Sequence, residues 1–153
     1  MSINKNLEIL NIDISKPPKA VGSYIAYKQI EKLIYISGQL PFKKDGSLIK
    51  GKVGLDIDLK KGQEAAYFCC INILAQLNQA CNGNLELVKN CVKITGYINS
   101  IDSFEDQPKI INSASELIVK IFNNQGKHAR AAVSVNSLPL GVAVEIEAIF
   151  EIN

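Results

Sequence analysis

The chain has 153 residues, 47% of them hydrophobic, and its 17 basic and 15 acidic residues leave a net charge of +2. A chain of this length forms one ordinary domain and buries a sizeable core. The nearly balanced charge argues against binding to nucleic acid or to a membrane surface by electrostatics alone. It favours small-molecule or protein partners. Residues 1–6 contain no apolar signal core, and no segment approaches the roughly 18 to 20 apolar residues that span a bilayer. We therefore expect a cytoplasmic protein with one domain over residues 1–153, in which residues 1–16 form a polar N-terminal extension.

The four cysteines stand at spacings that contain no C-x-x-C pair. They are Cys69, Cys70, Cys81 and Cys91, and the chain has one histidine, His128. This set does not fit a zinc site. Cys69 and Cys70 lie in an apolar helical segment, where a free cysteine usually behaves as a small buried hydrophobe. The alternative is a nucleophilic cysteine paired with the histidine.

The first part of the chain predicts a β-hairpin followed by a loop. Residues 15–19 break regular structure with two prolines, and residues 24–27 and 33–37 then form two short strands joined by a polar turn. Residues 38–41 end the second strand. The basic, glycine-punctuated segment 43–54 is expected to be a loop with solvated lysines.

Two amphipathic helices with a strand between them are predicted next. Asp58 is a suitable N-cap for a helix over residues 59–80, whose apolar residues recur every three or four positions. A glycine-containing turn ends this segment, and residues 87–98 then alternate as a strand. Pro108 lies in the first turn of a second helix, which continues to a break near residues 123–126.

The chain ends in two strand-like segments that carry charge on alternating positions. In residues 127–135, Arg130 shares one side with Ala132 and Ser134, while alanine and valine residues occupy the other side. In residues 144–152, three glutamates lie opposite an apolar row. The predicted order of elements is therefore ββαβαββ.

Two helices with one apolar stripe each can cover only one face of a sheet. The alternation is expected to place Arg130 with the glutamates on the other face, which must meet water or another subunit. Arginine is suited to binding a ligand carboxylate through two parallel hydrogen bonds, and a structural ion pair on a solvated sheet is the alternative. The small residues Ala132, Ser134 and Ala143 favour packing against another subunit with cyclic symmetry.

Four short segments stand in a particular order along the chain. They are AVGSY at 20–24, IYISGQLP at 34–41, HARAAV at 128–133 and LPLGVAVEIEAI at 138–149. Together they resemble the Rid (reactive-intermediate deaminase) family, also called YjgF-like or endoribonuclease L-PSP, over about residues 17–152. The resemblance implies an α+β fold like that of a bacillus-type chorismate mutase, with two helices on one face of a mixed sheet. It also implies a homotrimer with ligand clefts between the subunits.

The resemblance further implies which residues act at such a cleft. Arg130 is similar to the family's arginine that holds the substrate carboxylate, and Glu145 to its acid that orients the hydrolytic water. Periodicity alone does not choose between Glu145 and Glu147. Only the resemblance prefers the first.

Four further positions match residues that line the family's pocket. Tyr24 is similar to the cleft tyrosine, and it is expected to act with the arginine and the glutamate. Ser37 and Gly38 match a Ser-Gly pair at the end of the second strand. Asn112 falls where the family often has an asparagine early in the second helix. We therefore expect Ser37, Gly38, Asn112 and Arg130 to bind the substrate.

The implied reaction is hydrolysis of a reactive 2-imino acid to a 2-keto acid and ammonia, without metal or cofactor. A protonated imine is already electrophilic, so the enzyme has to hold the carboxylate, position a water and stabilise charge in the transition state. Residues 126–129 lack the aromatic residue and proline common in the family's imine deaminases. A trimer that binds a keto acid or another small carboxylate without turnover is therefore the alternative. One histidine and near-neutral charge give little support to a ribonuclease.

Overall fold

Five strands form one mixed sheet in the order β1-β2-β5-β3-β4 within residues 2–153, which the computed structural model describes. The strands are β1 (Tyr27–Ile30), β2 (Leu33–Gln39), β3 (Val88–Asn99), β4 (Ala129–Val135) and β5 (Val144–Ile152). β4 runs parallel to β3, and the other neighbouring pairs are antiparallel. This architecture confirms the predicted α+β class and the order ββαβαββ of the principal elements.

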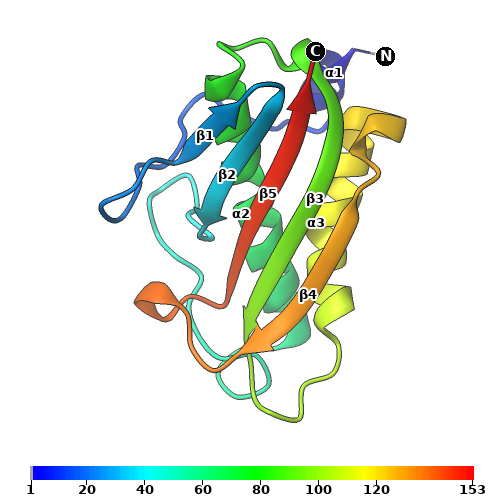
Figure 1. Ribbon diagram of the computed structural model, residues 1–153. Coiled ribbons are helices and arrows are strands. Elements are labelled where there is room, and N and C mark those ends of the chain that lie inside the picture. Colours follow the sequence, from blue (N-terminus) through cyan, green and yellow to red (C-terminus); the bar gives the residue numbers. More distant parts are fainter. Residues whose placement is uncertain (1) are drawn as a thin grey trace.

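Two long helices, α2 (Leu59–Ala80) and α3 (Gln107–Phe122), cover one face of the sheet (Figure 1). α2 begins after Asp58, whose side chain accepts a hydrogen bond of 2.8 Å from the backbone N–H of Lys61 and caps the helix as predicted. α3 has Pro108 in its first turn, where a missing N–H breaks no helical hydrogen bond. None of the helices within residues 2–153 is long and apolar enough to cross a membrane.

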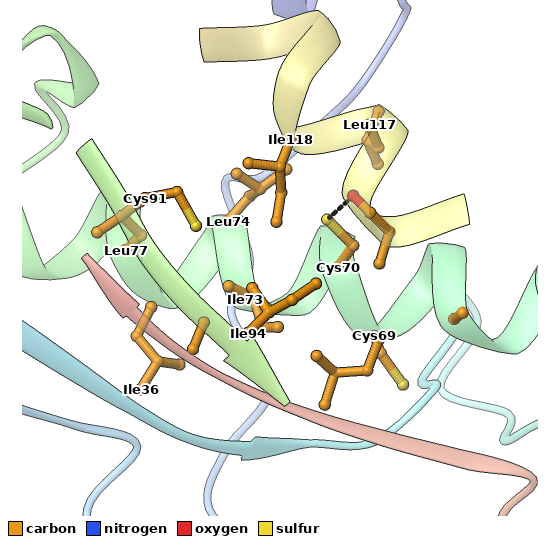
Figure 2. Packing of buried hydrophobic residues seen from close by; sticks show 14 of the residues in the cluster. Ile36, Cys69, Cys70, Ile73, Leu74, Leu77, Cys91, Ile94, Leu117 and Ile118 are labelled. Carbon is orange, nitrogen blue, oxygen red and sulfur yellow. Dashed lines mark hydrogen bonds between the residues drawn. The ribbon is translucent and has the colours of Figure 1, made fainter. Parts of the chain in front are cut away.

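The core fills the space between these helices and the sheet. Figure 2 shows Ile73 of α2 close to Ile94 of β3, and Leu74 and Cys70 on the side of α2 that faces α3. The Cys70 thiol donates a weak hydrogen bond of 3.6 Å to the backbone oxygen of Ala114. Burial raises the pKa of this thiol, so it stays protonated and unreactive. The predicted role of the paired cysteines as small core residues is confirmed, since both are fully buried.

The N-terminal extension contains a short helix that packs on the core. In α1 (Ile3–Ile9), Ile3 and Leu7 are buried, and the Asn6 side chain donates a hydrogen bond of 2.8 Å to the backbone oxygen of Ile121 in α3. The sequence analysis described residues 1–16 as a polar extension and did not predict this helix. Two apolar residues one turn apart are too short a pattern to reveal a helix, and tertiary packing stabilises it instead.

Shortening Leu7 to alanine is expected to lower the free energy of unfolding by about 2 to 3 kcal/mol, because it leaves a gap in the core. The Leu7 side chain is only 7% exposed, whereas Leu55 is 72% exposed and serves as the matched control. Leu55→Ala is expected to change the stability by less than about 0.5 kcal/mol. Urea denaturation of both variants measures the difference, and equal effects would contradict the packing of α1.

The predicted hairpin is present, but its first strand is displaced along the chain. β1 begins at Tyr27, at the end of the predicted strand 24–27, so Tyr24 lies in the loop before it. Lys28 pairs with Tyr35 in the antiparallel register of the hairpin. Strand propensity favoured residues 24–27, but regular pairing with β2 starts only at Tyr27.

The side chains of β4 face the opposite way from the prediction. Arg130 pairs with Ile94 of β3, which is fully buried beneath the helices, and paired residues point to the same face. Ala132, on the same side, packs on the core, and the Ser134 hydroxyl accepts a hydrogen bond of 2.9 Å from Gln107 of α3. Arg130 therefore lies on the helix-covered side, and the prediction that it shares a face with the glutamates was wrong. Alternation separates the two rows of a strand but does not say which row faces the helices.

Candidate active site

A cavity of about 500 Å³ opens on the face of the sheet that the helices leave uncovered. Its walls combine a loop tyrosine with two lysines and one glutamate on the strands. The polar residues that line it include Tyr24, Lys28, Ser37, Lys93, Thr95 and Glu147. The structure therefore brings Tyr24 and Ser37 together, as the resemblance implies. A volume of this size suits a small organic ligand.

Gly38 lies against the carboxylate of Glu145 at the edge of this region. A Cβ atom on Gly38 would stand 2.9 Å from Cδ of Glu145 and closer still to Oε1, so any side chain at this position would displace the carboxylate. The adjacent Ser37 hydroxyl donates a hydrogen bond of 2.7 Å to the backbone oxygen of Ile25 in the loop that carries Tyr24. The Ser-Gly pair thus fixes the loop on one side and leaves room for the acid on the other.

Two carboxylates share the uncovered face of β5. Burial, and then the neighbouring charge of Glu147, raise the pKa of the half-buried Glu145 above its usual value. The hydroxyl of Tyr97 donates a hydrogen bond of 3.3 Å to Glu147. A raised pKa makes the Glu145 carboxylate a stronger base than an ordinary glutamate, which favours a role as general base. Glu147 lines the cavity, whereas Glu145 does not line it and lies two residues earlier on the same face of β5.

Arg130 lies away from this cavity, on β4, where helix α3 holds its guanidinium group. Nη1 donates hydrogen bonds of 2.8 Å to Oδ1 of Asn112 and 3.2 Å to the hydroxyl of Ser115. Within residues 2–153, Nη2 and Nε make no hydrogen bond, so one edge of the guanidinium is available for a carboxylate. Asn112 is thus a partner of the arginine and does not line the cavity.

His128 extends this hydrogen-bonded group. Its Nδ1 lies 2.6 Å from the backbone oxygen of Gly126, and its Nε2 lies 2.9 Å from the Ser115 hydroxyl. Because a carbonyl only accepts, a neutral ring carries its proton on Nδ1, and Nε2 then accepts from the Ser115 hydroxyl. The histidine contacts no cysteine here, so the alternative of a Cys–His pair was wrong. The sequence signal for Ser115 was its position one helical turn after Asn112, on the same side of α3.

A single subunit does not bring the arginine and the acid together. β3 lies between β4 and β5, which puts their axes about 10 Å apart. In addition, Arg130 and Glu145 lie on opposite faces of the sheet. A ligand as small as an imino acid cannot contact both within one subunit.

Comparison with known proteins identifies the family. A family model described as "YjgF/chorismate mutase-like, putative endoribonuclease" matches residues 6–151. The chain belongs to this family. A similar protein, TCP17 of Trypanosoma cruzi, is 37% identical to this chain over 97% of this chain and 92% of its own length.

Similar solved structures have the same fold. The structure of protein Atu1372 from Agrobacterium tumefaciens, described as of unknown function, has a TM-score of 0.89 and 39% identity over 99% of this chain and 94% of its own. RidA from the Antarctic bacterium Psychrobacter has a TM-score of 0.63 and 30% identity, over 92% of this chain and 98% of its own. The predicted Rid-family membership and chorismate mutase-like fold are therefore confirmed.

The part of this YjgF-family chain that the structure describes, residues 2–153, holds no group of three or more His, Cys, Asp or Glu side chains placed to bind a metal ion. The polar groups of the candidate site are instead a guanidinium, carboxylates, hydroxyls and ammonium groups. Groups of these kinds can bind and orient an anion and can transfer protons.

Proposed function

We propose that this protein hydrolyses reactive 2-imino acids to 2-keto acids and ammonia in the cytoplasm. The observation that carries the proposal is the placement of Glu145, with its raised pKa, against Gly38 beside a cavity lined by Tyr24 and Ser37. A free guanidinium edge at Arg130 supplies the partner for a carboxylate. The similarity to a protein named RidA supports the same assignment.

In the proposed reaction, Arg130 holds the substrate carboxylate through two parallel hydrogen bonds. Glu145 accepts a proton from a water while the water oxygen bonds to C2 of the protonated imine. The resulting carbinolamine takes up that proton on nitrogen. Glu145 then accepts the proton of the C2 hydroxyl as the C2–N bond breaks, so the keto group forms and ammonia leaves, taking that proton from Glu145 as ammonium. Tyr24 lies in the cavity where its hydroxyl can donate to the substrate.

We propose that the site is completed between copies of the chain in a homotrimer. β4 is an edge strand, so the arginine that it carries lies at the margin of the subunit. The uncovered face displays Tyr35 and Val133, which are 42% and 44% exposed. Exposed apolar residues of this kind favour burial against another subunit. The Arg130 edge of one copy would then meet the cavity and Glu145 of the next.

Ammonia release from freshly generated 2-iminobutyrate tests the proposal. The wild-type protein is expected to accelerate the release beyond spontaneous hydrolysis, which is timed separately. A folded protein that gives no acceleration would overturn the enzymatic assignment. If 2-ketobutyrate then raises the melting temperature of that inactive protein, the alternative of a carboxylate-binding regulatory trimer takes its place.

The pH dependence of kcat is expected to follow Glu145. As a base, the carboxylate must be ionised, so kcat falls as the pH drops through its pKa, which burial and Glu147 raise above the usual glutamate value. The acidic limb should therefore lie at a higher pH than for an ordinary glutamate. The stability of the fold depends on pH with the opposite sign. Because the pKa of Glu145 is higher in the folded protein than in the unfolded chain, ionisation of this carboxyl destabilises the fold. The free energy of unfolding therefore falls as the pH rises from the pKa of the unfolded chain to that of the folded protein. Glu145→Gln should remove both effects, and an unchanged acidic limb in a pH–rate profile would contradict this role.

Loss of the Asn112 side chain is expected to affect substrate binding through Arg130. Asn112→Ala removes the shorter of the two hydrogen bonds to Nη1, so the guanidinium is less well oriented and KM should rise about three- to tenfold. The melting temperature should change little, because Asn112 is exposed. Asn124→Ala, at another exposed asparagine, is the control. Steady-state kinetics in which both variants match the wild type would contradict the positioning role.

A further inference from the structure

A second cavity, of about 600 Å³, lies on the opposite side of the sheet from the candidate active site. One wall is helix α2, and the other is the N-terminal segment 11–21, which leads from α1 toward β1 (Figure 1). The loop at residues 42–46 closes a third side. The volume falls within the range of small-molecule sites.

The floor of this cavity is apolar and rich in aromatic rings. Phe68, Ile71 and Ala75 of α2 line it together with Phe42 of the loop. Tyr67 also lines it, and its ring packs edge-on against that of Phe68, with centroids 5.5 Å apart and planes at 83°. Such rings favour a planar aromatic ligand, which also loses less rotational entropy on binding than a flexible chain.

Two buried side chains of α2 fix the loop and the N-terminal segment against this helix. Asn72, 7% exposed, donates hydrogen bonds of 2.9 and 3.1 Å to the backbone oxygens of Leu40 and Phe42 at the loop. One turn later, Gln76, 1% exposed, donates a hydrogen bond of 2.7 Å to the backbone oxygen of Pro18 in the N-terminal segment. The cavity is therefore preformed, and a ligand need not order its walls.

The charges around the opening are mainly positive. Lys16 and Lys19 of the N-terminal segment stand with Lys43 and Lys44 of the loop, and the acidic residue of the lining is Asp13. Lys43 forms an ion pair of 3.9 Å with Glu64. The other three lysines make no salt bridge within the part of the chain that the structure describes. This excess of ammonium groups complements an anion.

We propose that this cavity binds a small aromatic carboxylate, with its ring on the Phe68 and Ile71 floor and its carboxylate among the lysines. The inference goes beyond the proposed imine hydrolysis and does not depend on it, since the two sites lie on opposite sides of the sheet. A nucleotide fits less well. The amide nitrogens of Asn72 and Gln76 are already bonded to the walls, so they are unavailable to read a base.

Calorimetric titration of the full-length protein with 1-naphthaleneacetate tests the proposal. Comparison with the uncharged amide of the same acid measures the contribution of the negative charge to the affinity. Comparison with acetate measures the contribution of the aromatic ring. The acid is expected to bind about tenfold more tightly than the amide, and acetate not measurably. Lys19→Met should weaken the affinity for the acid about three- to fivefold and leave the affinity for the amide unchanged. Lys50→Met, at an exposed lysine outside the cavity, should change neither affinity.

Ile71→Trp fills the floor and should abolish binding of both the acid and the amide. If that variant fails to fold, the Lys19→Met comparison still decides, because Lys19 is exposed. Equal affinity for acid and amide, an unchanged affinity in Lys19→Met, or tighter binding of adenosine monophosphate than of the acid would each overturn the proposal. Competition by 2-ketobutyrate at the same site would assign the binding to the candidate active site instead, and would also overturn it.

Discussion

Replacing Arg130 with alanine is expected to lower kcat/KM for 2-iminobutyrate by about a thousandfold. The substrate carboxylate would lose a bidentate, charge-assisted contact, and removal of one partner of such a pair costs about 2 to 5 kcal/mol, where each 1.4 kcal/mol corresponds to a factor of ten. The fold should be unaffected, because Arg130 is exposed on an edge strand and its partner Asn112 is exposed as well. Ammonia release and thermal melting of the same preparation give both quantities.

Two further variants separate charge from geometry at this position. Arg130→Lys keeps the charge but loses the planar fork, so we expect a loss intermediate between the wild type and alanine, about ten- to a hundredfold. Lys127→Ala removes an exposed neighbouring cation and should have no effect on the rate. Full activity in Arg130→Ala would rule out this residue as the carboxylate-binding group.

Two variants with greatly lowered activity are expected to restore activity to each other when their subunits mix. Arg130→Ala retains Glu145, and Glu145→Gln retains Arg130. Because the two side chains lie on opposite faces of one subunit, an intact cleft can take one from each variant. Random assembly of equal amounts should leave about a quarter of the clefts with both groups, and thus about a quarter of the wild-type rate.

The control for this experiment is a partner that cannot donate the arginine. Mixing Arg130→Ala with a double variant, Arg130→Ala with Glu145→Gln, should give no recovery, since no subunit carries the guanidinium. Mass spectrometry establishes whether subunits have exchanged. Confirmed exchange without recovered activity would mean that the cleft takes both groups from the same chain, and the arrangement proposed between copies would then be incorrect.

The sequence predicted those parts of the fold that depend on local patterns. Asp58 and the apolar spacing after it predicted a helix over residues 59–80, and the structure has α2 at Leu59–Ala80. The alternating glutamates of β5 were predicted to face away from the core, and they do. Helix capping, apolar periodicity and strand alternation depend on residues that are close together in the chain. They can therefore be predicted from a single sequence.

The side on which Arg130 lies could not be predicted in the same way. It depends on the parallel register of β4 against β3, in which Arg130 pairs with Ile94, and this register is fixed by contacts between distant segments. The role of Asn112 depends on the same geometry, since it becomes a partner of the arginine only when α3 lies beside β4. Helix α1 was missed because its two buried apolar residues, Ile3 and Leu7, stabilise it by packing on the core and not through a local sequence pattern.

The connection from α3 to β4 has a consequence for how ligand specificity can differ between members of this family. Arg130 on the strand and its partners Asn112 and Ser115 on the helix belong to one continuous stretch of chain, whereas Glu145 belongs to another. Changes in residues 107–135 can therefore alter the arginine that we propose binds the substrate carboxylate, without changing Glu145. This stretch is a natural unit to exchange between related proteins, and a chimaera that receives it should acquire the donor's preference among carboxylates while keeping its own pH profile.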